Sequence, residues 1–195
     1  MYVHIAVRTF KFGSKTARND ADERHLLEDV VGGNQEAFRE LYCLYQRPLA
    51  RFVARIVPAH NMVEEVVNDT FWIVWRSART FRGGSLLSTW IMGIAYHRAL
   101  RLLRNQHTLT RSDSATQDGE ASSDESMSIE VQDWLRSGLR KLPALLRTTL
   151  ELAYYQGHSC EEIGAIMGCP PTTVKVRLFR ARLKLRAVLP ILAAP

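Results

Sequence analysis

The sequence of 195 residues is poor in the features that mark membrane and secreted proteins. It has no apolar run of the about 18 residues that a membrane helix needs, so we expect no membrane insertion. Its first fifteen residues, MYVHIAVRTFKFGSK, lack both a long apolar core and a small-residue cleavage site. These absences predict a cytoplasmic protein without a secretory signal, in which residues 1–23 form an extension before the first domain.

Cysteine is scarce. The three cysteines, Cys43, Cys160 and Cys169, are odd in number and show no framework spacing, which argues against a disulfide scaffold. Cys160 and Cys169 lie near His158, but their spacing fits no common zinc pattern and a fourth ligand is missing. We therefore expect Cys160 and Cys169 to be buried or half-exposed thiols, with no metal and no cofactor. Whether oxidation of Cys160 and Cys169 disturbs this region stays open.

Acidic residues are concentrated in the middle of the chain. Residues 106–129 carry five acidic residues, one Arg, no aromatic residue and few aliphatic ones. Such a segment cannot bury enough apolar surface to offset the entropy lost on ordering, which predicts a flexible acidic linker. The segments before and after it are both basic, and the whole chain has a net charge of +6. This charge is compatible with an anionic partner such as nucleic acid.

The segment before the linker has helical periodicity. From Phe38 to Ile56 apolar residues recur every three or four positions, interrupted by Pro48, which kinks or divides the helix, and ended by Pro58. Asn61 with Glu64 predicts the start of a second helix. That helix buries a valine-rich face and presents Glu65, Asn68, Asp69 and Trp72 on the opposite side. "FRGGS" (81–85) breaks the pattern, and a third helix begins near Ser88.

The segment after the linker predicts a helix-turn-helix. A short helix ends before Pro143, and a second spans about Ala144 to Gln156, with Gly157 as its stop. Ser159 and Glu162 form a capping box for a third short helix, which ends at Gly168. A tight turn and a final helix follow, and this succession is typical of the helix-turn-helix.

The final helix has two distinct faces. "CPPTTVKVRLFRARLKLR" contains six basic residues and no acidic one. On a helical wheel, the apolar face consists of Val174, Leu178, Ala181, Leu185 and Val188. The other face bears hydroxyls and cations near its N-terminus, which is the end that a recognition helix turns toward base edges. A solvated basic helix is the plainer alternative.

These motifs resemble the extracytoplasmic-function (ECF) group of bacterial sigma factors. "EEIGAIMGCPPTTVKVRLFRARLKLR" resembles the family's carboxyl-terminal domain, region 4. "EAFRELYCLYQRPLARFVARIV", "VEEVVNDTFWIVWRSARTFRGG" and "STWIMGIAYHRALRLLR" resemble, in order, the helices of region 2. The resemblance implies an all-α fold with two small domains, at 24–105 and 130–195, joined by the linker at 106–129. It also implies a subunit that brings RNA polymerase to promoters and is not an enzyme.

The resemblance implies three groups of contact residues. Core RNA polymerase, through the clamp and flap of its largest subunits, would meet Glu65, Asn68, Asp69 and Trp72. The −10 promoter element would meet Phe81, Arg82, Ser85, His97, Arg98, Arg101 and Arg104. The −35 element would meet Thr172, Thr173, Lys175, Val176, Phe179, Arg180 and Arg182. An anti-sigma partner is common in the family, and no small-molecule substrate is expected.

The sequence departs from the family pattern on both DNA-facing helices. His97 and Arg101 stand where the family usually has Asn and Asp, and Asn68 replaces a common Gln. Val176 and Phe179 stand where it has Ser and often His. These two side chains can contact a thymine methyl but cannot donate to a guanine, so we expect fewer polar base contacts than the family norm.

Two other classes of function remain as alternatives. A free-standing helix-turn-helix regulator would bind operators as a dimer, but no dimerisation helix is evident. A nuclease using Glu64, Glu65 and Asp69 would need three carboxylates on one helix face, which their spacing does not give. Nor does the sequence contain a glycine-rich phosphate loop or a catalytic triad.

Overall fold

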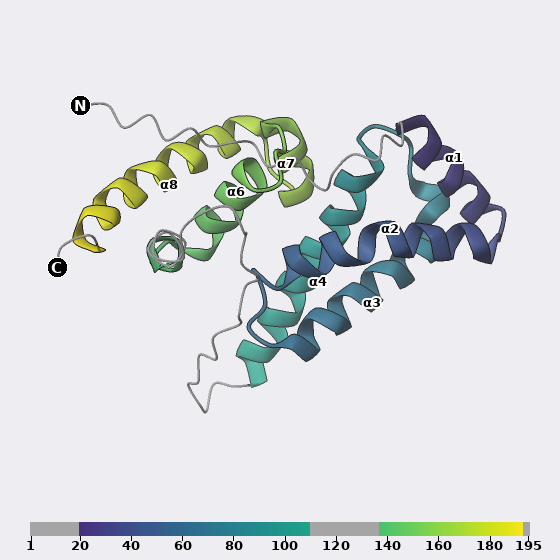
Figure 1. Cartoon of the computed structure of the whole chain (residues 1–195), viewed down its shortest axis with the longest axis horizontal. Coiled ribbons are helices and arrows are strands. Elements are labelled where there is room, and N and C mark those ends of the chain that lie inside the picture. Colours follow the sequence, from purple (N-terminus) through teal and green to yellow (C-terminus); the bar gives the residue numbers. More distant parts are fainter. Residues whose placement is uncertain (1–19, 110–136, 193–195) are drawn as a thin grey trace. The chain divides into compact units, whose positions relative to one another are not determined.

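The computed structural model describes residues 20–109 and 137–192, and within these ranges every regular element is a helix. Internal contacts divide the chain into two compact units. One contains α1 to α4, and the other contains α6, the first part of α7 and α8 (Figure 1). The all-helical prediction is confirmed for the described residues. Residues 110–129 of the predicted linker and residues 1–19 of the predicted extension lie outside them, whereas residues 106–109 and 20–23 are helical.

The first unit begins with two helices joined by a tight turn. α1 (Asp20–Val31) buries Leu26, Leu27 and Val30. Asn34 then caps α2 (Gln35–Val53), its side-chain oxygen accepting from the backbone N–H groups of Glu36 and Ala37 at 3.0 and 3.2 Å. Pro48 lies inside α2, so the helix is not divided there.

The unit is completed by α3 (His60–Ser77), a short 3₁₀ turn η1 (Ala78–Thr80) and α4 (Leu87–Leu109). The predicted N-cap at Asn61 is wrong. Ala59 occupies the cap position in extended conformation, without a side-chain hydrogen bond, so Asn61 already lies in the first turn. The backbone N–H groups of Met62 and Val63 donate to the Ala59 carbonyl instead.

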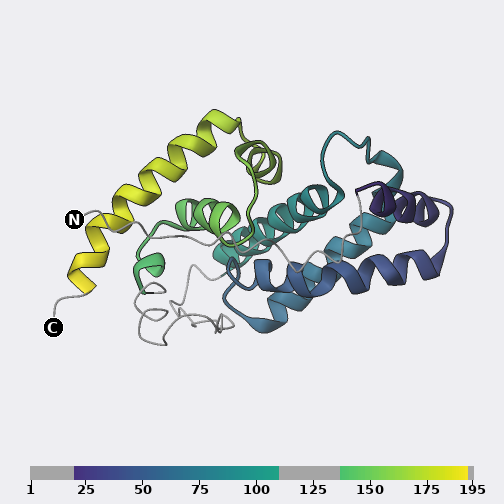
Figure 2. The same cartoon turned by 45° about the horizontal axis from the view of Figure 1, so that its top comes forward.

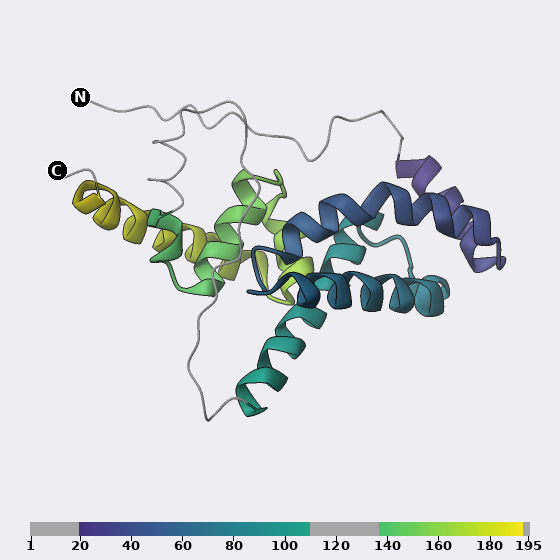
Figure 3. The same cartoon turned by 60° about the horizontal axis from the view of Figure 1, so that its bottom comes forward.

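A continuous apolar core holds this unit together. α2 packs against both α1 and α3, and α3 packs against α4 (Figures 1 and 3). Phe52, Leu41 and Leu49 of α2 are buried together with Val66 and Val74 of α3. Burial of each such side chain is worth about 1.5–3 kcal/mol, so this core is the main source of the unit's stability. The predicted apolar stripe of α2 is therefore its core face.

The second unit contains a helical turn at residues 137–140, α6 (Ala144–Tyr154), the first part of α7 (Cys160–Met167) and α8 (Pro171–Leu192). Figure 2 shows α8 as a long helix that follows the short α7. Leu139, Leu142, Leu146, Leu150 and Ala181 form a core, with Tyr154, Tyr155 and Leu185 packed against it. α6 is two residues shorter than predicted. No helix in the described part of the chain is long and apolar enough to cross a membrane.

Candidate nucleic-acid and protein interfaces

The predicted capping box at the start of α7 is confirmed. The Glu162 carboxylate accepts from the backbone N–H of Ser159 at 2.7 Å, and the Ser159 hydroxyl accepts from the backbone N–H of Glu162 at 3.2 Å. His158 lies beside this box, where its burial lowers the imidazole pKa and the Glu162 carboxylate acts in the opposite direction. The box fixes where α7 begins, and so where the turn after it falls.

The turn between α7 and α8 depends on two glycines. Gly168 has a φ of +65°, in the left-handed region that glycine adopts most readily. A Cβ on Gly164 would lie 2.7 Å from the Cys169 carbonyl oxygen, closer than a side chain tolerates. Pro171 is the first residue of α8, where its missing N–H leaves no hydrogen bond unmade. This local chemistry sets the tight turn that the sequence predicted.

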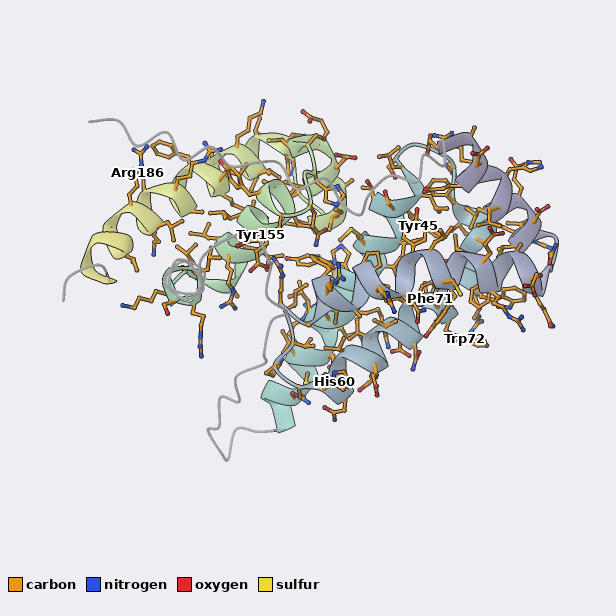
Figure 4. All side chains as sticks on the ribbon, viewed as in Figure 1. Tyr45, His60, Phe71, Trp72, Tyr155 and Arg186 are labelled. Atoms are coloured by element: carbon orange, nitrogen blue, oxygen red, sulfur yellow. The ribbon has the colours of Figure 1, made fainter. Side chains whose placement is uncertain are left out.

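α8 presents its two faces as predicted. Val174, Leu178 and Ala181 are buried on the side of the unit's core. Thr172, Lys175, Val176, Phe179 and Arg180 are all exposed, and Thr173 is half-buried. Figure 4 shows the side chains along this helix. All seven predicted −35 residues therefore lie on one helix, six of them exposed and Thr173 half-buried.

Arg182 is exposed as well, but its side chain also contacts a residue of α6. Its Nε donates to the Tyr154 hydroxyl of α6 at 2.7 Å, and its guanidinium lies 5.5 Å from the centre of the Tyr154 ring. This pair ties α8 to α6 at the edge of the exposed face. Sequence reasoning did not single out Tyr154, because its partner lies 28 residues further along the chain.

The cysteines at the turn show no metal-site geometry. Cys160 and Cys169 are both free and half-buried, and Arg177 donates to the Cys169 sulfur at 3.2 Å. Among the described residues no group of three or more His, Cys, Asp and Glu side chains is placed to hold a metal ion.

The loop at residues 81–86 is tethered to α1. The Phe81 ring lies 5.3 Å from that of Trp90, and both are half-buried, while Arg82 is exposed. Gly83 has a φ of +69°, and its carbonyl accepts from Arg24 at 3.4 Å. Arg24 in turn pairs with Asp20 at 2.8 Å. Sequence reasoning missed Arg24, because the pattern gives no sign that α1 reaches this loop.

The cations of α4 differ in their surroundings. His97 and Arg101 are exposed, whereas Arg98 is half-buried and pairs with the Asp69 carboxylate of α3. Arg104 donates to the Leu100 carbonyl of its own helix at 3.3 Å. A groove of about 180 Å³ between α3 and α4 is lined by Glu65, Val66, Asp69, Arg98, Arg101, Leu102 and Asn105. This groove joins residues that the sequence assigned to polymerase with others assigned to DNA.

The outer side of α3 carries an accessible aromatic residue. The Trp72 side chain is 59% exposed, beside the exposed Glu65 and Asn68, and Arg76 lies 5.7 Å from the centre of its ring (Figure 4). The neighbouring Phe71 is buried instead. It meets the Tyr42 ring of α2 with 4.5 Å between centroids. Arg76 was not among the predicted contacts.

The two units match two protein families. Residues 41–108 match Sigma-70 region 2, and residues 132–185 match Sigma-70 region 4. The ECF RNA polymerase sigma-E factor of Escherichia coli K12 is 36% identical over 172 residues, covering 80% of this chain and 88% of that protein. Its Haemophilus influenzae counterpart is 32% identical over 173 residues, covering 82% and 91%.

Solved structures show the same fold. The sigma factor RpoE in complex with the anti-sigma factor NepR from Bartonella quintana matches with a TM-score of 0.66 and 28% identity, covering 79% of this chain and 97% of that one. CnrH in complex with the cytosolic domain of CnrY matches with a TM-score of 0.64 and 25% identity, covering 87% and 97%. The two family matches together span more than half of the sequence. The chain therefore belongs to the ECF sigma factors of the sigma-70 family, non-enzymatic subunits that act with RNA polymerase in transcription initiation.

Proposed function

We propose that the two units divide promoter recognition between them, the first binding polymerase and opening the −10 element and the second reading the −35 element. The observation that carries this proposal is α8, whose buried apolar face fixes its orientation while its exposed face bears cations and no acidic residue. Such a face complements the phosphates that flank a major groove. We assign these two functions to residues 24–105 and 130–195, preceded by an extension at 1–23 and joined by a linker at 106–129. α1 begins four residues before the first of these ranges and α4 ends four residues after it.

The outer face of α3 is the proposed clamp contact. Trp72 supplies an accessible aromatic anchor, and exposed aromatic residues are frequent hot spots of protein interfaces. Glu65 and Asn68 flank it, whereas Asp69 acts through its pair with Arg98. We further assign to the second unit a contact with the polymerase flap.

The loop after η1 and the outer side of α4 are the proposed −10 contacts. Phe81 and Ser85 offer an apolar wall and a hydroxyl to an unstacked base, and Arg82 offers a cation to its phosphate. On α4, Arg101 is the direct phosphate contact and Arg98 a positioning residue, because Asp69 already neutralises it. His97 and Arg104 complete this group.

The exposed start of α8 is the proposed −35 contact. Thr172, Thr173 and Lys175 can bond base edges and phosphates in the major groove. Arg180 and Arg182 lie farther along the helix, at positions suited to the backbone. Val176 and Phe179 bring apolar contact only.

An anti-sigma protein is a further proposed partner. Both solved relatives described above are complexes with partner proteins, one of them named as an anti-sigma factor. A pull-down with the full chain as bait, from cells lysed in mild detergent, tests this. A partner protein recovered with wild type, and released by competing core polymerase, is the expected result.

Reconstitution with core RNA polymerase tests the proposed function. We expect the full chain to direct transcription from discrete start sites, and Trp72→Ala to weaken core binding about thirtyfold, the scale of an interface hot spot. Leu44→Ala, which truncates an exposed apolar residue of α2, is the matched control. Tight binding of the isolated chain to symmetric operators, with no effect of added polymerase, would favour the free-standing regulator instead.

A further inference from the structure

α8 carries a second apolar face, which the fold leaves exposed. The side chains of Val176, Phe179 and Leu183 are 48%, 60% and 50% exposed. Their spacing of three and then four residues places them in one stripe along the helix. We call these three residues the exposed apolar stripe. It lies opposite the buried face of α8, so the helix is apolar on both sides and cationic between them.

The surroundings of the stripe favour nucleic acid as its occupant. Lys175, Arg180, Lys184 and Arg186 are exposed beside it, and α8 contains no acidic residue. Within the described part of the chain these four cations form no ion pair or hydrogen bond. An apolar stripe between free cations complements a major groove, where phosphates line the edges and base edges form the floor.

The chemistry of the stripe limits what it can recognise there. Valine and phenylalanine side chains neither donate nor accept hydrogen bonds, so they cannot distinguish bases by their polar groups. The one apolar group that a base pair presents in the major groove is the C5-methyl of thymine. The N-terminal turns of a recognition helix lie nearest the base edges, which selects Val176 and Phe179 rather than Leu183 on the fourth turn.

We propose that Val176 and Phe179 determine specificity by packing against thymine C5-methyl groups in the upstream promoter element. This inference rests on the proposed function, because it assumes that α8 enters that element. Removing one methyl from such a contact loses the burial of about one carbon atom's apolar surface. That loss corresponds to an about fourfold weaker complex.

The experiment replaces thymine with deoxyuridine, which removes the methyl and keeps the base pairing. Holoenzyme formed from the full chain and core polymerase first selects its promoter from a library randomised upstream. Each thymine of the selected −35 element is then replaced in turn, on either strand, and the dissociation constant is measured. We expect about fourfold weakening at two positions, with Val176→Ala abolishing the effect at one and Phe179→Ala at the other.

Two control variants keep the result interpretable. Leu183→Ala removes the third residue of the stripe, and Leu145→Ala removes an exposed apolar residue of α6. Both should leave the ratio of thymine to deoxyuridine affinities at the wild-type value. All four truncated side chains are at least 45% exposed, so the variants should fold, which circular dichroism checks.

The outcomes separate the inference from the proposed function. If holoenzyme selects and transcribes a promoter but deoxyuridine binds as tightly as thymine at every position, methyl recognition is wrong and the proposed function stands. Methyl recognition by these two residues is equally wrong if the penalties persist in both Val176→Ala and Phe179→Ala. If Val176→Ala, Phe179→Ala and Leu183→Ala all weaken binding of a protein partner equally and leave promoter affinity unchanged, the stripe is a protein-docking face and methyl recognition is wrong. If no library member is selected, the proposed function itself fails.

Discussion

The guanidinium of Arg98 on α4 donates to the carboxylate of Asp69 on α3, so an ion pair joins two helices that the resemblance assigns to different partners. Arg101 is nearby on α4 but exposed, and it forms no ion pair with any described residue. Both are arginines on the same helix, but their electrostatic surroundings differ. One is neutralised within the protein, and the other is free to neutralise a phosphate.

This difference predicts different salt dependences for two variants. Arg101→Ala should reduce the slope of log affinity against log salt for promoter binding by about one, because one phosphate contact is lost. Arg98→Ala should leave the slope nearly unchanged and cost at most about 1 kcal/mol of stability, since the pair is about one-third exposed. Filter binding of holoenzyme over a salt series measures both slopes. Equal slope changes in the two variants would mean that DNA displaces Asp69 from Arg98.

Tyr45 gives a prediction about stability and pH. Its hydroxyl donates to the Glu23 carboxylate at 2.6 Å, and burial together with that carboxylate raises the pKa of Tyr45. A raised folded-state pKa stabilises the protein below the usual tyrosine value of about 10, and this stabilisation declines as the pH rises further. Tyr45→Phe should therefore cost about 1.5 kcal/mol at neutral pH, as the loss of a hydrogen bond to a charged group.

The fall of the unfolding free energy at alkaline pH, the alkaline limb of the stability curve, separates the effect of this hydrogen bond from that of packing alone. Above about pH 10, wild type should lose about 1.4 kcal/mol more per pH unit than Tyr45→Phe does. Denaturant titrations followed by tryptophan fluorescence give these free energies. Tyr42→Phe is the matched control, because the Tyr42 ring packs at a tilt against Phe71 and no hydrogen bond of its hydroxyl is present among the described residues. Parallel alkaline limbs for wild type and Tyr45→Phe would contradict the assignment.

The capping box predicts how firmly the start of α7 is held. Glu162→Ala removes the carboxylate that accepts from Ser159 N–H and should cost about 1 kcal/mol. The backbone amide hydrogens in the first turn of α7 should then exchange with solvent about fivefold faster, as measured by hydrogen–deuterium exchange. Glu161→Ala alters the adjacent exposed carboxylate, for which no hydrogen bond or ion pair is described, and it serves as the control. The same acceleration in both variants would show that the negative charge at the helix start, and not the capping-box hydrogen bonds, stabilises the first turn of α7.

Gly164 predicts a strict limit on the turn before α8. In Gly164→Ala the new methyl would lie 2.7 Å from the Cys169 carbonyl oxygen, so backbone must shift. We expect a cost of at least about 2 kcal/mol, in the range of overpacked sites, and a large loss of −35-dependent promoter binding. Ala165→Ser, at the next and exposed position of α7, should be nearly neutral. Thermal unfolding and promoter affinity are measured for both variants. A Gly164→Ala protein with wild-type stability and promoter affinity would show that the turn relaxes at little cost.

Local signals made the second unit the more predictable half. The capping box, Gly168 and Pro171 each act within a few residues, so the sequence predicts the ends of α7 and the start of α8. The alternation of buried Val174 with exposed Val176 follows from helical periodicity alone. In the first unit the prediction of Asn61 as the helix cap was wrong, because α3 starts at His60, two residues earlier than a cap at Asn61 requires.

The contacts that sequence reasoning missed are those between distant segments. Arg24 to Gly83 spans 59 positions, Asp69 to Arg98 spans 29 and Tyr154 to Arg182 spans 28. A periodic pattern shows which face a side chain occupies, but not which residue of another helix meets it there. For this reason the sequence could assign cations to faces, and only the structure distinguishes the paired Arg98 from the exposed Arg101.

The division of labour between the two units is tested most directly by footprinting one promoter with holoenzyme. Protection over the −35 element reports the second unit, and permanganate reactivity of unpaired thymines near −10 reports opening by the first. We predict that Phe179→Ala weakens the upstream protection, while complexes that do form open normally. We predict that Arg82→Ala keeps the upstream protection and loses permanganate reactivity. The opposite pattern, or wild-type holoenzyme that neither protects nor opens any promoter, would contradict the account.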